Sequence, residues 1–273
     1  WYNSTEQVMK GLVSNPAGSW ATGGSLNTGR GLLGGVGTQT QALAFGGGGP
    51  TAVTEQYNGT SWTEVNDLNS ARRSLGSGGS YTSAIGFGGA SPPFGSPGIT
   101  GVTETWDGSS WTEVADLNTN RRDIAGAGAD NTAALAIGGS VDPGNRALTE
   151  SWNGSSWTEV NDLNSARKDM GSAGTQPSAL VFGGLSATAA TEQWNGSSWT
   201  EVADLTTARG ANAGAGTYTA ALSFGAVHES GNGTKTETWN GSSWTEVGDL
   251  SVSRGYLAGA GTNTAGLAFG GLA

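Results

Sequence analysis

Six arginines recur at one position of a repeated pattern, each ten residues after a tryptophan. A guanidinium binds carboxylates or phosphates through paired hydrogen bonds, so such a set could recognise an anion or meet acidic partners inside the protein. A side chain present in every repeat usually serves the stacking of every repeat. We therefore interpret these arginines as structural, with a functional role as the alternative. The pairs are Trp20 and Arg30, Trp62 and Arg72, Trp111 and Arg121, Trp157 and Arg167, Trp199 and Arg209, and Trp244 and Arg254.

Glutamates form a second recurring feature, and some of them should repel each other. If Trp106 pairs with Trp111 across a hairpin, Glu104 lies opposite Glu113, and facing like charges destabilise a strand pair. Three explanations stay open: another register, two solvated side chains, or an arginine or a cation between them. Calcium prefers oxygen ligands, but one glutamate pair per repeat supplies too few. We therefore expect no metal site and no cofactor.

The residue types needed for catalysis are scarce. The chain has no cysteine, which excludes thiolate chemistry, disulfides and cysteine-bound metals. His228 is the only histidine; it lies in a variable loop and has no serine-centred motif to partner it. We predict no catalytic residue and a protein that is not an enzyme.

The composition argues against two classes of partner. The 273 residues include 12 basic and 22 acidic side chains, and the net charge of -10 repels phosphate backbones, so nucleic-acid binding is not expected. No segment approaches the roughly 20 apolar residues of a membrane helix, so membrane insertion is not expected either. The 49 glycines recur at fixed repeat positions beside eleven tryptophans, which favours tight turns and close packing over disorder.

Short strands must position these residues. Within each repeat, side chains alternate with a period of two between turn signals, and Asn153-Gly154 is typical of a hairpin turn because both residues accept a positive φ. Four antiparallel strands per repeat, with repeats of 42 residues (Trp20 to Trp62) to 49 residues (Trp62 to Trp111), predict one propeller blade per repeat. In the repeat after Arg121 we expect strands at Ile124 to Gly128, Ala133 to Ile137, Leu148 to Trp152 and Trp157 to Val160.

This pattern resembles the Kelch repeat family from about Trp20 to Gly271. A double glycine follows an apolar strand, an aromatic residue comes about a dozen residues later, and a tryptophan and an arginine follow. One copy reads Phe182-Gly183-Gly184, Trp194, Trp199 and Arg209. Departures are mild, such as Tyr57 at the position where other copies have tryptophan. Because large aromatic rings contribute the most burial per residue, we expect the paired tryptophans to pack between blades, with sugar stacking as the alternative.

The two ends of the chain are complementary halves of a repeat. The last unit stops after two strands, while Thr5-Glu6-Gln7 echoes Thr54-Glu55-Gln56 and Gly18-Ser19-Trp20 matches the start of a fourth strand. We therefore predict a single all-β domain over residues 1–273: a six-bladed Kelch-type propeller with four antiparallel strands per blade, closed by residues 1–25 and 255–271 in one shared blade. Because the chain begins with Trp1, we expect it to be the C-terminal part of a longer protein. Homo-oligomerisation through upstream residues stays open.

The repeats differ mainly between the double glycine and the next Thr-Glu. The insertions are Gly48 to Val53, Ala90 to Val102, Ser140 to Leu148, Leu185 to Ala190 and Val227 to Lys235. In an up-and-down blade these loops share one face with the arginine-bearing linkers, and the uniform Asn-Gly turns lie on the other. Variable loops on a rigid scaffold usually carry recognition, so we select Phe94, Asp142, Arg146 and His228 as candidate binding residues.

A second resemblance bears on function. Trp1-Tyr2-Asn3-Ser4-Thr5 is similar to a run found where phage fibre and tail proteins pass from shaft to tip, and Kelch-like units of this kind occur in structural proteins of marine phages. This implies a non-enzymatic virion or extracellular surface module, of the tail-fibre or decoration type, for host attachment. Its partner would be a cell-surface glycan or a neighbouring virion protein. A purely structural spacer is the alternative, followed by a carbohydrate-active enzyme.

Overall fold

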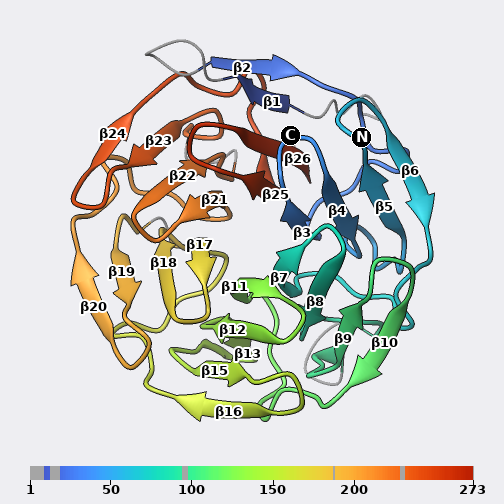
Figure 1. The fold of residues 1–273 in the computed structure, drawn as a ribbon. Coiled ribbons are helices and arrows are strands. Elements are labelled where there is room, and N and C mark those ends of the chain that lie inside the picture. Colours follow the sequence, from blue (N-terminus) through green and yellow to red (C-terminus); the bar gives the residue numbers. More distant parts are fainter. Residues whose placement is uncertain (1–8, 13–18, 94–97, 187, 228–230, 273) are drawn as a thin grey trace.

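The computed structural model describes residues 9–12, 19–93, 98–186, 188–227 and 231–272, which form an all-β propeller around a central channel (Figure 1). None of these described residues belongs to a helix long and apolar enough to cross a membrane. Glycine- and alanine-rich strands lie nearest the channel, and the tryptophan-bearing strands lie at the rim.

Five blades follow the sequence repeat, and each consists of four antiparallel strands in the order of the chain. Blade 1 contains β3 (Gly34–Gly37), β4 (Ala42–Phe45), β5 (Thr54–Tyr57) and β6 (Trp62–Val65); blade 2 contains β7 (Gly76–Ser80), β8 (Ser83–Phe87), β9 (Thr103–Trp106) and β10 (Trp111–Val114). Blade 3 contains β11 (Ala125–Asp130), β12 (Ala133–Ile137), β15 (Thr149–Trp152) and β16 (Trp157–Val160). Blade 4 contains β17 (Gly171–Thr175), β18 (Ser178–Phe182), β19 (Thr191–Trp194) and β20 (Trp199–Val202); blade 5 contains β21 (Ala213–Thr217), β22 (Ala220–Phe224), β23 (Thr236–Trp239) and β24 (Trp244–Glu246).

A composite sheet lies between blades 5 and 1 (Figure 1). Its order is β2 (Ser19–Thr22), β1 (Met9–Leu12), β26 (Gly266–Leu272) and β25 (Gly255–Gly261), so strands from both ends of the chain meet in it. Among the described residues, β1 pairs with β26 only through Met9 with Ala268 and Lys10 with Leu267. Every blade pairs its second and third strands through four residue pairs.

The predicted six-bladed Kelch-type propeller is corrected accordingly. The complete repeat makes five blades of four antiparallel strands, and the composite sheet, which is not a copy of the repeat, closes the ring. The physical reason lies in the sequence of β1, Met9-Lys10-Gly11-Leu12, which lacks the Thr-Glu-x-Trp pattern that sets the register of the third strand elsewhere. Thr5-Glu6-Gln7, the predicted counterpart of that pattern, lies outside the described residues.

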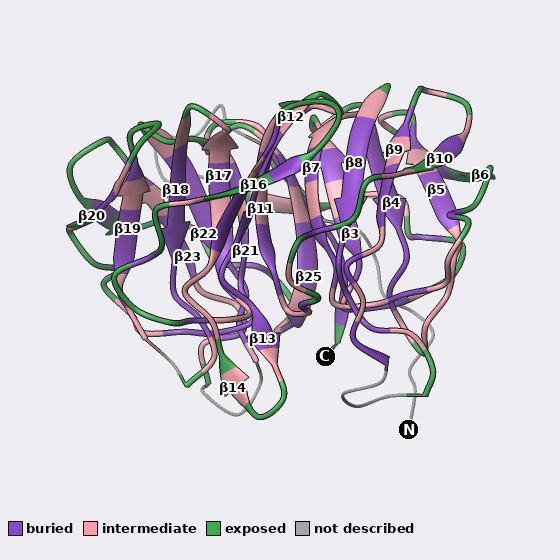
Figure 2. Cartoon of the chain, turned by 90° about the horizontal axis from the view of Figure 1, so that it is seen from below, coloured by how far each residue is buried: buried purple, intermediate pink, exposed green. Residues whose placement is uncertain are grey.

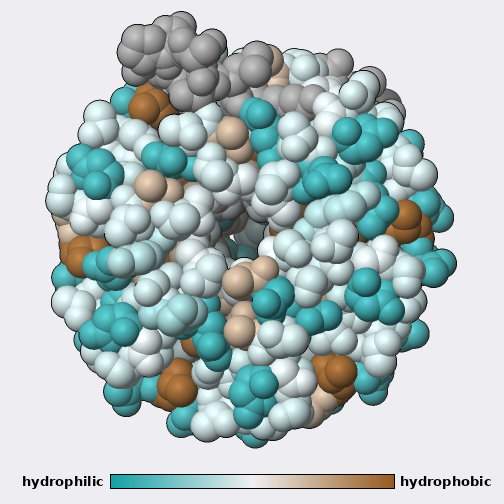
Figure 3. Space-filling model, in the orientation of Figure 1, coloured by the Kyte–Doolittle hydropathy of each residue, from teal (hydrophilic) through white to brown (hydrophobic). Residues whose placement is uncertain are grey.

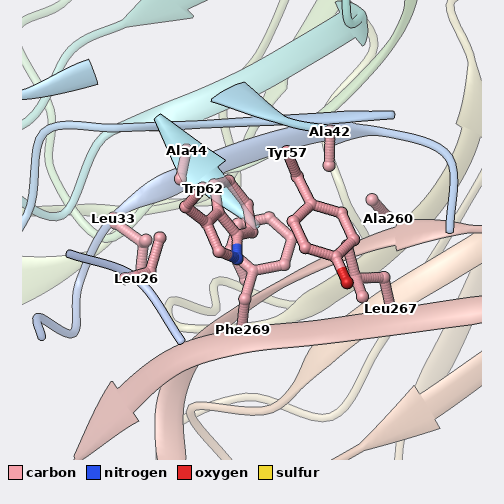
Figure 4. Close-up of a cluster of buried hydrophobic side chains, with 10 residues drawn as sticks. Leu26, Leu33, Ala42, Ala44, Tyr57, Trp62, Ala260, Leu267 and Phe269 are labelled. Atoms are coloured by element: carbon pink, nitrogen blue, oxygen red, sulfur yellow. The ribbon is translucent and has the colours of Figure 1, made fainter. Parts of the chain in front are cut away.

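Apolar side chains fill the spaces between neighbouring sheets. Phe45 of blade 1 lies 4.7 Å from Trp111 of blade 2, measured between ring centroids, and the same contact recurs around the ring. Figure 4 shows the corresponding cluster where the composite sheet meets blade 1, with Trp62 and Phe269 in contact at 5.0 Å. Large aromatic rings contribute the most burial per residue, so this packing stabilises the stacking of the sheets.

The paired tryptophans follow the same rule. Trp106 and Trp111 face each other with ring centroids 5.5 Å apart, and both are buried. The indole N–H of Trp111 donates to the Thr54 hydroxyl of the preceding blade at 3.1 Å. Trp157, Trp199 and Trp244 donate in the same way to Thr103, Thr149 and Thr191 of the preceding blades. The predicted packing role is therefore confirmed for the paired tryptophans of the five blades, whose rings are buried.

Glycine is required where the innermost strands approach each other. A Cβ placed on Gly126 would lie 2.1 Å from the carbonyl oxygen of Ser77 in the preceding blade, and one on Gly214 would lie 2.1 Å from the carbonyl oxygen of Ser172. No side chain fits at such distances. The glycine-rich first strands therefore allow the blades to close tightly around the channel.

The blades present two different faces. Figure 2 shows the hairpin of β13 (Ser140–Val141) and β14 (Gly144–Asn145) projecting from one side, which also carries the arginine linkers and the variable loops; we call this side the loop face. The opposite side carries the Asn-Gly-Ser-Ser turns, such as Asn153 to Ser156, and we call it the turn face.

Candidate functional site

The recurring arginines lie inside the blades, each at the loop-face end of its first strand. Arg72 donates to Glu104 Oε1 at 2.9 Å and to the carbonyl oxygen of Gly88 at 2.9 Å, and both side chains are fully buried. The same ion pair occurs in each of the five blades: Arg30 with Glu55, Arg72 with Glu104, Arg121 with Glu150, Arg167 with Glu192 and Arg209 with Glu237. In the composite sheet, Arg254 donates to the carbonyl oxygen of Gly270 at 2.9 Å.

This arrangement explains how facing glutamates coexist. The register is the one counted from the sequence, with Glu104 opposite Glu113. Glu104 is buried and is neutralised by Arg72, while Glu113 is exposed. The second oxygen of Glu104 accepts hydrogen bonds from the backbone N–H of Asn69 at 2.7 Å and from its side-chain amide at 2.9 Å. The arginine is therefore the element that relieves the repulsion, and it ties the linker to the blade.

Burial lowers the pKa of Arg72, Arg121 and Arg209, and the paired glutamates oppose that effect. Their terminal N–H groups donate to carboxylates and carbonyl groups of the same blade, while the buried Nε groups of Arg72 and Arg121 have no hydrogen-bond partner among the described residues. The arginines thus hold the scaffold together and present no guanidinium group to the loop face.

The four predicted binding residues have different outcomes. Phe94 and His228 lie outside the described residues. Asp142 and Arg146 both belong to the loop that carries the β13–β14 hairpin. Arg122 donates to Asp142 Oδ1 at 3.0 Å, and Arg146 donates to the carbonyl oxygens of Gly144 and Asn145 at 3.2 and 3.1 Å. The hairpin is thereby fastened to the linker at its base.

A set of residues at the channel mouth was not predicted. The residue two positions after each recurring arginine has a left-handed backbone, with φ between 52° and 59°. Each donates its N–H to the carbonyl oxygen of its counterpart in the preceding sheet at 2.8 to 3.0 Å, so the hydrogen bonds form a closed circle. We call this circle the mouth ring. Its members are Leu32, Ser74, Asp123, Asp169, Ala211 and Tyr256.

The mouth ring surrounds a cavity of about 90 Å³ on the loop-face side of the channel. The channel itself, lined by the inner strands, has a volume of about 330 Å³, and Figure 3 shows its opening at the centre of the turn face. A left-handed backbone costs a residue other than glycine about 1 kcal/mol or more of conformational free energy. The backbone hydrogen bonds of the mouth ring offset this cost. The ring therefore holds six side chains, of five residue types, in equivalent positions.

The side chains of the mouth ring are polar on one side and apolar on the other. Asp123 and Asp169 are neighbours, whereas Leu32, Ala211 and Tyr256 form the opposite part. Asp123 Oδ2 accepts a hydrogen bond from the Ser140 hydroxyl at 2.8 Å and lies 3.5 Å from Lys168 Nζ. The sequence gives only a weak signal for this position, because the residues before it also vary among the repeats: Gly31, Arg73, Arg122, Lys168, Gly210 and Gly255.

The Asp169 carboxyl lies in an unfavourable place for a charge. Burial first, and the Asp123 charge second, raise its pKa to about 8, although Lys168 and Arg122 act in the opposite direction.

Across the described residues, no group of three or more His, Cys, Asp and Glu side chains is arranged to hold a metal ion.

Comparisons with known proteins inform the fold. No protein-family model matches the chain, and no curated protein matches it. Among solved structures, the one titled "Structure of YjhT" is similar, with a TM-score of 0.72 and 12% sequence identity over 91% of this chain and 92% of that chain. At this level of identity the similarity concerns the fold alone, and it supports the conclusion that the chain is a β-propeller.

Proposed function

We propose that this chain is a non-enzymatic binding module on a virion or another extracellular surface, and that its loop face is the attachment surface. The partner class is a cell-surface glycan or a neighbouring structural protein. The observation that carries the proposal is the confinement of variation to one face of a repeated scaffold.

The repeated part is uniform in its contacts. In each of the five blades an aspartate after the fourth strand accepts a hydrogen bond from the first residue of the third strand, as Asp67 does from the Thr54 N–H at 3.0 Å. The turn-face turns also share one pattern, in which an Asn or Asp side-chain oxygen accepts two backbone N–H groups. A scaffold held in this way can carry different loops without changing shape.

The variable part has the mixed chemistry that recognition uses. The β13–β14 hairpin brings Asp142 to Arg122, which directly precedes Asp123 of the mouth ring, and Arg146 follows the hairpin. Tyr256 is a half-buried aromatic residue of the same ring. Polar groups beside an aromatic and apolar surface suit a saccharide or a protein loop. Weak single sites gain strength when several copies act together, as on a particle surface.

The Kelch-type and phage relationships belong to this proposal as well. They rest on the double-glycine, tryptophan and arginine pattern and on the Trp1 to Thr5 run. Under this proposal, homo-oligomerisation would supply the multiple copies.

The test is a binding measurement with the chain displayed in several copies on streptavidin, applied to a glycan array and to intact cells. One variant carries the short Leu185 to Ala190 loop in place of Ser140 to Leu148, and a second carries it in place of Ala90 to Val102. We expect both to lose most of the binding. Ser155→Thr on the turn face is the matched control and should bind like the original chain.

Equal binding by all folded variants would contradict the loop-face assignment. Absence of binding by the original chain to every surface would favour a spacer role, and cleavage of a glycan by the purified chain would overturn the non-enzymatic proposal.

A further inference from the structure

Two carboxyl groups are held side by side at the channel mouth by the backbone. Asp169 donates its N–H to the carbonyl oxygen of Asp123 at 3.0 Å, and both residues have the same left-handed backbone, with φ of 52° and 58°. Their side chains therefore leave neighbouring, equivalent positions of the mouth ring. The closed circle of hydrogen bonds prevents the two linkers from moving apart.

The charged groups around Asp169 come from its own linker, the neighbouring linker and the hairpin. Its own linker contributes Lys168, and the neighbouring linker contributes Arg122 and Asp123. The hairpin contributes Asp142, which is bound to Arg122. On the other side Ala211 donates its N–H to the Asp169 carbonyl oxygen at 2.9 Å and brings no charge. The recurring Arg121 and Arg167 are committed to Glu150 and Glu192.

The two carboxyl groups share this environment unequally. Asp123 Oδ2 accepts a hydrogen bond from the Ser140 hydroxyl at 2.8 Å. The same oxygen lies 3.5 Å from Lys168 Nζ and 3.6 Å from Arg122 Nε. None of the described residues donates a hydrogen bond to the Asp169 carboxyl group. A half-buried carboxylate without donors, next to another carboxylate, is destabilised relative to its protonated form.

We propose that Asp123 and Asp169 hold one proton between them at neutral pH, and that its loss loosens the β13–β14 hairpin on the loop face. The step breaks one carboxyl O–H bond, and the proton passes to a buffer base in solution. The raised pKa of Asp169, about 8, agrees with the geometry. Carboxyl pairs of this kind titrate as a unit.

The link to the hairpin runs through Arg122 and Asp123. Arg122 lies between Asp123 and Asp142, and its backbone exchanges hydrogen bonds with Ser140 at 3.1 and 2.8 Å. A second negative charge at the mouth attracts Arg122 and Lys168 toward the pair. The bond from Arg122 to Asp142 is weakened in consequence, because one guanidinium then serves three carboxylates.

The claim that Asp123 and Asp169 hold one proton at neutral pH is tested by NMR titration of the carboxyl carbons in the full chain labelled with ¹³C-aspartate. We expect one carboxyl group to titrate with a midpoint above pH 7 in the original chain and in Asp142→Asn, and this transition to be absent in Asp169→Asn. The measurement on the original chain requires no variant to fold. If all its aspartates titrate below pH 6, the proposal is overturned.

The hairpin is tested with a nitroxide label. Because the chain has no cysteine, Asn145→Cys provides one labelling site at an exposed position of the hairpin. Label mobility should increase between pH 6.5 and 9, and should stay constant when Asp169→Asn is added. Unchanged mobility in the first protein would refute the coupling to the hairpin. The relevance to partner binding depends on the proposed function, but neither measurement involves a partner, so the two proposals fail separately.

Discussion

Replacing Arg121 with methionine is expected to destabilise the propeller by about 3 kcal/mol. The Arg121 and Glu150 side chains are 0% and 1% exposed, and Arg121 donates to Glu150 at 2.9 Å and to the carbonyl oxygens of Gly138 and Leu148 at 2.7 Å each. Removing one partner of a buried ion pair costs about 3–5 kcal/mol because the other charge stays buried. Asn118 still donates two hydrogen bonds of 2.8 Å to Glu150, which favours the lower end of that range.

The assay is urea unfolding followed by tryptophan fluorescence. Arg146→Met is the matched control: it removes an arginine of the same blade that donates only to its own loop, and it should change stability by less than about 0.5 kcal/mol. Adding Glu150→Met to Arg121→Met should recover part of the loss, since no unpaired buried charge remains. A loss of less than about 1 kcal/mol for Arg121→Met, as for an exposed pair, would refute the reasoning.

Three further outcomes are expected. Gly126→Val should lower the melting temperature strongly, because even a Cβ would lie 2.1 Å from the Ser77 carbonyl oxygen; thermal unfolding measures this. Trp157→Phe should cost about 1–3 kcal/mol in chemical unfolding, because the buried Thr103 hydroxyl loses its 3.1 Å bond from the indole N–H. For Asp169, a folded-state pKa of about 8 lies above the ordinary 3.8, so the folded chain keeps a proton that the unfolded chain has lost. Stability should therefore fall as pH rises from about 4 to about 8, by up to about 1.4 kcal/mol per pH unit, and Asp169→Asn should abolish that slope.

Each of these has its own control. Gly144 lies on the loop face, where a Cβ would meet only the movable end of the Arg146 side chain at 3.4 Å, so Gly144→Val should be tolerated. An equal fall in melting temperature for both glycine variants would contradict the role of close strand approach. Adding Thr103→Val to Trp157→Phe should cost little more, and a fully additive loss would show that the two groups are independent. Asp142→Asn should keep the pH slope, and a slope that survives Asp169→Asn would assign the proton to another group.

Strand periodicity and turn chemistry were sufficient to predict most of each blade. The predicted strands Ala133 to Ile137 and Trp157 to Val160 coincide with β12 and β16, and the register that placed Glu104 opposite Glu113 is the observed one. These features depend on neighbours within one hairpin, which the Asn-Gly turn fixes locally. The pairing of β11 with β12 has one irregularity, a register shift between Gly128 and Asp130.

The mouth ring and the composite sheet could not be predicted in the same way. The left-handed backbone of Asp123 and Asp169 is imposed by hydrogen bonds between linkers more than 40 residues apart. The residue type at these positions does not by itself predict a left-handed backbone. The proximity of the two carboxyl groups is a product of ring closure. Likewise, the pairing of β1 with β26 depends on a strand that lacks the repeat pattern, so local signals do not determine its register.

The most direct test of the loop-face assignment uses two tyrosines as internal probes. Tyr256 belongs to the mouth ring on the loop face, and Tyr218, which is 37% exposed, lies in the turn between β21 and β22 on the turn face. The measurement is hydroxyl-radical footprinting, read by mass spectrometry, of the chain alone and bound to a glycan or cell surface that it retains. Our account predicts that the partner protects Tyr256 and the β13–β14 hairpin while Tyr218 stays reactive. Protection of Tyr218 with Tyr256 unchanged would contradict it.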